Sequence, residues 1–351
     1  MARNQRIFYA CQAVAIMDRG EIPTSAGVVK GLQSVGMSST FTLDQVFEMG
    51  QIEIYENVEQ VADIEVTLEK VLDGNKLIYT LASGGACRTD VVTATKKRCD
   101  VYVAVFDDGL SHATGVPRNV CYNSGMFTSS VSYSYSVDGS ATESVTLVGN
   151  DRFWNTETAG TVIGTAPGAL WRTNEGSLAH LNISAEFDGA DAAPSGVARR
   201  VDVDIARSDI PAIVLAQGGD DSTSEAGISS NAHIQSISIS TDFGQENIQE
   251  LGRFGPYTRY ATFPVEVTCD FEVMATSGDL INVSGAAPNL ANNDIRIVDT
   301  AGTDISLGTD GAGKNKLTSV SYSGGDTGGG NSTVSFSFSN FNVLTVHDST
   351  A

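Results

Sequence analysis

The stretch of this sequence that comes nearest to a cofactor-binding motif is residues 308–315, GTDGAGKN. Its glycines and lysine match the phosphate-binding loop G-x-x-x-x-G-K-[S/T], but Asn315 stands where that loop needs a hydroxyl to hold magnesium. A strand pattern follows the motif, whereas a phosphate site of this kind needs the N-terminus of a helix. We therefore predict a β-turn at this position and no nucleotide cofactor.

Residue types that carry hydrolytic or metal chemistry are present but are not spaced for it. The histidines lie far apart, without a Cys or carboxylate at metal-ligand spacing: His112, His180, His233 and His347. No G-x-S-x-G sequence offers a serine nucleophile, and the abundant carboxylates come with no sign of the substrate cleft of a glycosidase. The sequence therefore predicts a protein that is not an enzyme and that has no metal or cofactor.

The carboxylates that do form a pattern lie on two segments that alternate strictly between polar and apolar residues. Residues 63–69 read DIEVTLE and residues 265–270 read VEVTCD, so in each the acidic side chains share one face of a strand. The matched acidic positions are Glu65 with Glu266, and Glu69 with Asp270. Two interpretations remain open: a solvated sheet face, or the negatively charged bore of a ring whose sheets face inward. Repetition of the charges favours the bore.

An internal repeat organises the rest of the chain. Residues 33–50, QSVGMSSTFTLDQVFEMG, align without a gap with residues 235–252, QSISISTDFGQENIQELG, and six of the eighteen positions are identical. Further along, SVSYS at 130–134 recurs at 319–323. A period near 200 residues fits a doubled domain and is too long for a solenoid. We expect domains at 1–154 and 155–351, the second with a loop-rich excursion over about 155–232.

The patterning predicts an all-β protein with sparse helix. Strands are expected at 63–69, 100–106, 119–136 and 143–148 in the first half, and at 264–273, 294–298, 317–323 and 333–346 in the second. Residues 76–81 are expected to be a strand that returns from a turn at Asp73-Gly74. The spacing of Thr42 and Gln45 is that of a helix capping box, so a short helix ending at Gly50 is expected, with a second ending at Gly252.

Composition limits the partners and the compartment. A net charge of −21 argues against a surface that grips nucleic acid, because affinity for phosphates needs Lys and Arg. The odd number of widely spaced cysteines, five, suggests free thiols in a reducing compartment. Neither a signal-peptide pattern nor an apolar run long enough to span a membrane is found, so we expect synthesis in a cytoplasm and no membrane partner.

Three segments resemble the tail tube proteins of tailed bacteriophages. They are LDQVFEMGQIEIYENVEQVADIEVTLEKVLDG, SSVSYSYSVDGSATESVTLVGNDRFW and ISTDFGQENIQELGRFGPYTRYATFPVEVTCDFEV. The resemblance covers most of residues 33–154 and 233–275 and is weak elsewhere. It implies tube domains, each made of two packed, mostly antiparallel β-sheets with one short helix and a long hairpin or loop that contacts the neighbouring ring. Six such domains make a ring, and stacked rings make a hollow conduit for the genome.

This chain departs from the family pattern of one tube domain per chain by carrying two. Three copies would then form a pseudo-hexameric ring; a hexamer with one domain outside is the alternative. The resemblance further implies a place in the virion tail, synthesis in the bacterial host cytoplasm, sheath, tape-measure and tail-terminator proteins as partners, and DNA that passes without specific binding. Competing hypotheses are a tail-completion or hub ring of the same fold, and a doubled β-sandwich that binds glycans, which Trp154 and Trp171 alone would serve poorly.

Overall fold

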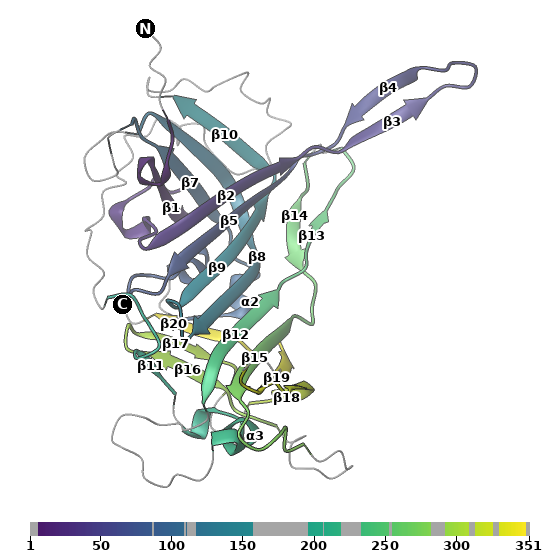
Figure 1. Cartoon of the computed structure of the whole chain (residues 1–351). Coiled ribbons are helices and arrows are strands. Elements are labelled where there is room, and N and C mark those ends of the chain that lie inside the picture. Colours follow the sequence, from purple (N-terminus) through teal and green to yellow (C-terminus); the bar gives the residue numbers. More distant parts are fainter. Residues whose placement is uncertain are drawn as a thin grey trace.

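The computed structural model describes residues 6–85, 88–108, 110, 117–156, 196–205, 207–218, 233–252, 255–281, 292–308, 313–325 and 330–348. It confirms the all-β class: long antiparallel strands dominate, and the α-helices of the described residues are short (Figure 1). They are α1 (Ile78–Ala82), α2 (Val91–Ala94) and α3 (Ala212–Leu215).

One large sheet runs through the molecule in the strand order β18-β19-β15-β12-β8-β9-β5-β2, with every neighbouring pair antiparallel (Figure 1). The strands are β2 (Leu32–Thr40), β5 (Asp63–Val71), β8 (Asn119–Ser136), β9 (Thr142–Gly149), β12 (Ile234–Asp242), β15 (Glu266–Met274), β18 (Lys316–Ser323) and β19 (Thr333–Phe341). These bounds confirm the strands predicted around 63–69, 119–136, 143–148, 264–273 and 317–323.

This sheet consists of two four-stranded units with the same internal order. The first unit is β8-β9-β5-β2 and the second unit is β18-β19-β15-β12. Both units break register at the same places: at Gln33 and Gln235, and at Ser129 and Thr318. The Gln33 and Gln235 side chains also make the same contact, each donating to the backbone carbonyl two residues earlier, at 3.2 and 3.1 Å. The sequence repeat is therefore a repeat of strand order and of bulges.

Two further groups of strands pack behind the large sheet. One extends the N-terminal part of β8 and contains β1 (Gln12–Asp18), β7 (Cys99–Val105) and β10 (Asp151–Thr156). The other has the order β11-β16-β17-β20-β6 and contains β6 (Arg88–Asp90), β11 (Val203–Asp204), β16 (Arg296–Asp299), β17 (Thr303–Ser306) and β20 (Thr345–Asp348). Because β6 comes from the first half of the chain and pairs with β20, the two halves are interlocked.

The helices predicted to end at Gly50 and Gly252 are wrong: each segment is half of a β-hairpin. β3 (Leu43–Phe47) pairs with β4 (Ile54–Glu59), and β13 (Gln245–Ile248) pairs with β14 (Thr258–Ala261). Gly50 and Gly252 do have the positive φ expected of them, 97° and 86°, but that conformation serves a hairpin turn as well as a helix end. The β3–β4 hairpin projects away from the body (Figure 1).

The strand predicted at 76–81 is also wrong, because residues 78–82 form α1. The first free backbone N–H groups of this helix, those of Ile78 and Tyr79, donate to the carboxylate of Glu143 on β9 at 2.7 and 3.1 Å. A helix start satisfied from a distant strand leaves no capping signal in the local sequence. The predicted strands at 100–106, 294–298 and 333–346 correspond to β7, to β16, and to β19 with β20. Residues 88–94, for which no strand or helix is predicted, contain β6 and α2.

Candidate assembly surface

The two units are joined edge to edge inside the single chain. β12 of the second unit pairs with the C-terminal part of β8 of the first, from Ser236 opposite Ser136 to Asp242 opposite Ser130. Ile237 and Ile239 on one side of this joint, and Val131 and Tyr133 on the other, are buried. The joint is therefore a fully packed continuation of the sheet.

The outer edges of the sheet are the counterparts of the two strands that meet in the joint. β2 corresponds to β12, and β18 corresponds to the C-terminal part of β8, but in the described part of the chain β2 pairs with β5 alone and β18 with β19 alone. Their apolar side chains are accordingly less covered. Val35 and Met37 are only half-buried where Ile237 and Ile239 are buried, and Tyr322 is 49% exposed where Tyr133 is buried.

An aromatic residue shows the largest contrast between joint and edge. Phe243 directly follows β12, is fully buried, donates its N–H to the Ser129 carbonyl at 2.8 Å and stacks on Tyr79 of α1. Its counterpart Phe41, which directly follows β2, is 74% exposed. The same residue type at the same place in the two units is thus packed in the joint and bare at the edge.

The hairpin beyond Phe243 rests on the first unit. Arg259 of β14 forms an ion pair with Asp63 at 2.6 Å and donates to the carbonyl of Gly149 and to Asn150. Burial lowers the pKa of the Arg259 guanidinium, and the Asp63 carboxylate opposes that shift. On β13, Gln245 donates to the carbonyl of Thr128. These contacts fix the second hairpin across the end of the joint.

The β3–β4 hairpin exposes a large apolar surface. Its exposed apolar side chains are Leu43, Val46, Phe47, Met49, Ile52, Ile54, Tyr55 and Val58. Met49 and Ile52, at the tip, are as exposed as they would be in an extended chain. The second hairpin also exposes apolar residues, including Ile248 and Leu251. Many exposed apolar side chains on one projecting hairpin are typical of a site of protein association.

The polar face of the large sheet carries the four acidic residues singled out in the sequence. Glu65, Glu266 and Asp270 are exposed and Glu69 is half-exposed, while the alternate residues on β5 and β15 are buried. The strict alternation along these strands is as expected. The partners of the acidic residues across the sheet are mainly Ser and Thr, as in the row Glu69, Ser144, Ser132, Ser240, Thr268 and Ser339.

The equivalence of the acidic residues differs by two positions from the one that the sequence match gives. Ser34 and Ser236 correspond, and in the sheet they contact Glu69 and Glu272, with oxygen–oxygen distances of 3.4 and 3.2 Å. Glu69 therefore corresponds to Glu272, and Glu65 corresponds to Thr268, since these two lie opposite Ser38 and Ser240. Sequence reasoning missed Glu272. The equivalence is set by how β5 pairs with β2 and β15 with β12, and a linear alignment does not contain that pairing.

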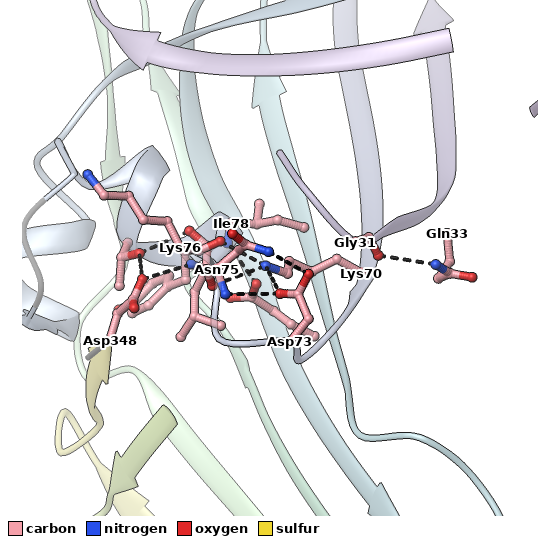
Figure 2. Close-up of polar contacts among 12 residues, drawn as sticks. Gly31, Gln33, Lys70, Asp73, Asn75, Lys76, Ile78 and Asp348 are labelled. Carbon is pink, nitrogen blue, oxygen red and sulfur yellow. Dashed lines mark hydrogen bonds and ion pairs between the residues drawn. The ribbon is translucent and has the colours of Figure 1, made fainter. Parts of the chain in front are cut away.

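A buried polar cluster lies behind the first unit (Figure 2). Lys70, fully buried on β5, forms an ion pair with Asp73 at 3.3 Å and donates to the carbonyls of Asn75 and Lys76. Directly opposite on β9 is Glu143, whose carboxylate also accepts the Tyr133 hydroxyl at 3.0 Å. Burial raises the pKa of Glu143, and Lys70 together with the donors opposes the rise. The cluster positions α1, and with it Tyr79, against Phe243 of the joint.

The other candidate residues form no site in the described part of the chain. Four cysteines, Cys11, Cys99, Cys121 and Cys269, are free and buried, and Cys87 lies outside the described residues. So do His112, His180, Trp171 and residues 309–312 of the phosphate-loop-like stretch, whereas Asn315 is buried and donates to the carbonyls of Asn293 and Leu307. Among the described residues no group of His, Cys, Asp and Glu could hold a metal ion. No described helix has the length and apolar character needed to cross a membrane.

No protein-family model matches the sequence, and no curated protein matches it. Among solved structures, the chain is similar to a component of the PVC sheath–tube complex of an extracellular contractile injection system in the extended state, at 12% identity and a TM-score of 0.33 over 44% of this chain and 95% of that one. It is similar to the tube-terminating cap of the anti-feeding prophage (13%, 0.33, 44% and 95%) and to a component of its baseplate (13%, 0.29, 44% and 97%). These values describe a partial likeness in chain path and say nothing of function.

Proposed function

We propose that this chain is a major tail tube subunit, a structural protein that assembles into stacked rings around a genome conduit. The observation that carries the proposal is the composition of the large sheet. Two like units meet edge to edge within it, and its outer edges, β2 and β18, are the counterparts of the two strands that meet. Such edges invite pairing with further chains. An edge that matches the opposite edge of another copy makes a head-to-tail interface, which closes into a ring when the rotation allows.

Three copies close the ring in this proposal, because each copy brings two units and six units form the pseudo-hexamer. The domains would be 1–154 and 155–351, interlocked through β6. A ring of six chains, with one unit of each outside, is the alternative. Closure satisfies both edge strands at once, which a linear chain of copies cannot do.

The polar face of the sheet lines the bore in this proposal. Its short Ser and Thr side chains leave the wall smooth, and Glu65, Glu69, Glu266 and Asp270, joined by Glu272, make it negative. DNA carries about one charge per 1.7 Å of its axis, so a wall with many Lys or Arg would bind phosphates along its whole length. A negative wall leaves water and counterions between itself and the DNA. The function is then a matter of geometry and repulsion, without catalysis or a cofactor.

The wider setting follows from the same proposal. The protein would be made in the bacterial host cytoplasm and reside in the virion tail, in contact with sheath, tape-measure and tail-terminator proteins and with no membrane. A tail-completion or hub protein of the same fold would form one ring and stop. The exposed apolar β3–β4 hairpin favours the stacking subunit, because a surface of this size has a use if another ring covers it.

Negative-stain electron microscopy of the purified chain, together with its mass in solution, tests this proposal. Hollow tubes of constant width built from rings of three chains are expected. Rings of six would keep the tube and overturn the stoichiometry, isolated rings that never stack would favour the hub or completion protein, and a stable monomer at high concentration would overturn the tube and favour the glycan-binding module.

The charge of the bore has its own test. Tubes of a variant with Glu65→Lys, Glu69→Lys, Glu266→Lys and Asp270→Lys are expected to assemble and to retain short duplex DNA at low salt, with retention lost as salt is raised. Wild-type tubes, and a control in which the same four residues become Gln, are expected to retain none. Equal retention by all three would contradict the assignment of these residues to the bore.

A further inference from the structure

The joint inside the chain specifies the contact between chains residue by residue. Each residue of the joint has an equivalent on a free edge of the sheet. Ser240 of β12 corresponds to Ser38 of β2, and Ser132 of β8 corresponds to Ser321 of β18. Both assignments follow from the registers, in which Ser38 lies opposite Glu65 as Ser240 lies opposite Thr268, and Ser321 lies opposite Ser335 as Ser132 lies opposite Ser144. In the joint, Ser240 and Ser132 are directly opposite each other.

We propose that β2 of one copy pairs antiparallel with β18 of a second copy in the register of the internal joint, an inference that rests on the proposed function. Ser38 then lies opposite Ser321 of the partner subunit, and Met37 opposite the partner's Tyr322, as Ile239 lies opposite Tyr133. The apolar residues that the isolated chain leaves half-covered, Val35, Met37 and Tyr322, fall on the core side of this interface. Each free edge is therefore covered by the opposite edge of a second copy: β2 by β18, and β18 by β2.

Phe41 anchors this interface. Phe243 in the joint donates its N–H to the carbonyl of Ser129, whose counterpart is Thr318, and its ring is buried behind the sheet. By the same geometry Phe41 donates to the carbonyl of the partner's Thr318 and buries its ring. Burying a Phe side chain contributes about 1.5–3 kcal/mol. Phe41 is thus exposed in the single chain because the surface that covers it belongs to another copy.

The contacts of the two hairpins support the same register, because both partners of a contact change from polar to apolar together. In the chain, Gln245 of the second hairpin donates to the backbone of Thr128. The counterpart of Gln245 is Leu43, and the counterpart of Thr128 is Leu317, so a polar contact inside the chain becomes an apolar one between copies. Likewise Arg259, paired with Asp63, corresponds to Asn57, which would face the partner's Glu266. The base of the β3–β4 hairpin therefore lies across the partner's second unit, and its tip, with Met49 and Ile52, stays exposed for contact with another ring.

Disulfide cross-linking tests the register directly. The variant Ser38→Cys with Ser321→Cys, purified under reduction and then oxidised as tubes, is expected to link most chains into covalent dimers and closed trimers that revert on reduction. Ser132→Cys with Ser240→Cys is the positive control, because it places cysteines at the equivalent pair inside the chain and should give an intramolecular disulfide. Ser38→Cys with Ser319→Cys is the out-of-register control: diagonal Cα atoms, about 7–8 Å apart, exceed the span of a disulfide.

The outcomes separate this inference from the proposed function. At least tenfold more linked chain for Ser321→Cys than for Ser319→Cys supports the register. The reverse yields overturn the register while keeping edge pairing. Absence of links in both variants, with tubes present and the internal control oxidised, overturns edge pairing between copies but leaves the tube proposal standing. A wild-type chain that forms no rings removes the proposed function itself.

Discussion

The two units differ in chemistry at one pair of positions on the buried face of the sheet. In the first unit Lys70 and Glu143 lie directly opposite each other, and in the second unit the same places hold Val273 and Val334. All four are buried. The strand framework therefore accepts either a charged or an apolar pair at this point, so the framework alone does not require the charges.

The charges serve what lies next to the framework. The Glu143 carboxylate accepts hydrogen bonds from the first backbone N–H groups of α1. The Lys70 ammonium donates to two carbonyls of the turn that precedes the helix. A buried helix start without acceptors would leave unsatisfied donors, each costing about 1–3 kcal/mol. The helix in turn presents Tyr79 to Phe243. From this difference between the units we infer that Lys70 and Glu143 support α1 and the joint, and not the sheet itself.

The largest expected effect on the free energy of unfolding comes from comparing the same substitution, Phe to Ala, in the joint and at the edge. Phe243→Ala removes a fully buried ring and is expected to lower the free energy of unfolding of the unassembled chain by about 3–5 kcal/mol. Phe41→Ala, its counterpart, is expected to change it by less than about 0.5 kcal/mol, because the ring is exposed. Urea denaturation at concentrations below assembly measures both.

Phe41→Ala should impair assembly although it leaves the stability of the single chain almost unchanged. The variant is expected to fold as the wild type does and to raise the concentration at which rings appear, as followed by light scattering. Equal destabilisation of the single chain by the two substitutions would contradict the distinction between joint and edge.

A smaller effect is expected when the pair of the second unit is copied into the first. Lys70→Val alone leaves Glu143 without its closest cation and is expected to cost about 3–5 kcal/mol. The double variant Lys70→Val with Glu143→Val removes both charges and is expected to cost about 1–3 kcal/mol, which remains because the N–H groups of Ile78 and Tyr79 lose their acceptor. A double-mutant cycle from denaturation curves gives the coupling.

The outcome of that cycle bears on the role assigned to α1. A double variant as stable as the wild type would mean that the helix start finds other acceptors, and that Glu143 does not hold it. Additive costs of the two single substitutions would mean that the charges act independently, contrary to their position opposite each other.

The sequence predicted what depends on periodicity and repetition. Alternation placed Glu65 and Glu266 on the polar face, and the repeat indicated two like sets of strands. It could not predict features set by distant contacts. The segment ending at Gly50 carries capping residues typical of a helix, yet pairing with β4 makes it a strand, and α1 depends on Glu143, 65 residues away from Ile78. The two-residue error in matching Glu69 arose because the like segments IEVT (64–67) and VEVT (265–268) were aligned, whereas strand pairing with β2 and β12 sets the equivalence.

The smallest expected effect is a pH dependence that the first unit has and the second lacks at this position. Burial raises the pKa of Glu143 above its value in the unfolded chain, so the folded state holds its proton to higher pH. The stability that this group contributes is complete below the unfolded pKa and is lost as pH rises through the folded one. The valines of the second unit do not titrate. Glu143→Gln, which cannot ionise, is therefore expected to cost most below the unfolded pKa and progressively less as pH rises through the folded pKa.

Comparing unfolding free energies of the wild type and Glu143→Gln at each pH isolates this contribution, because the other acidic residues titrate in both proteins. A cost that grew with pH would mean that Lys70 and the three donors outweigh burial. The pKa of Glu143 would then lie below its value in the unfolded chain, and ionisation beside Lys70 would stabilise the folded state. Glu143 would still titrate where Val334 does not, but its ionised form, and not its protonated form, would favour the folded state.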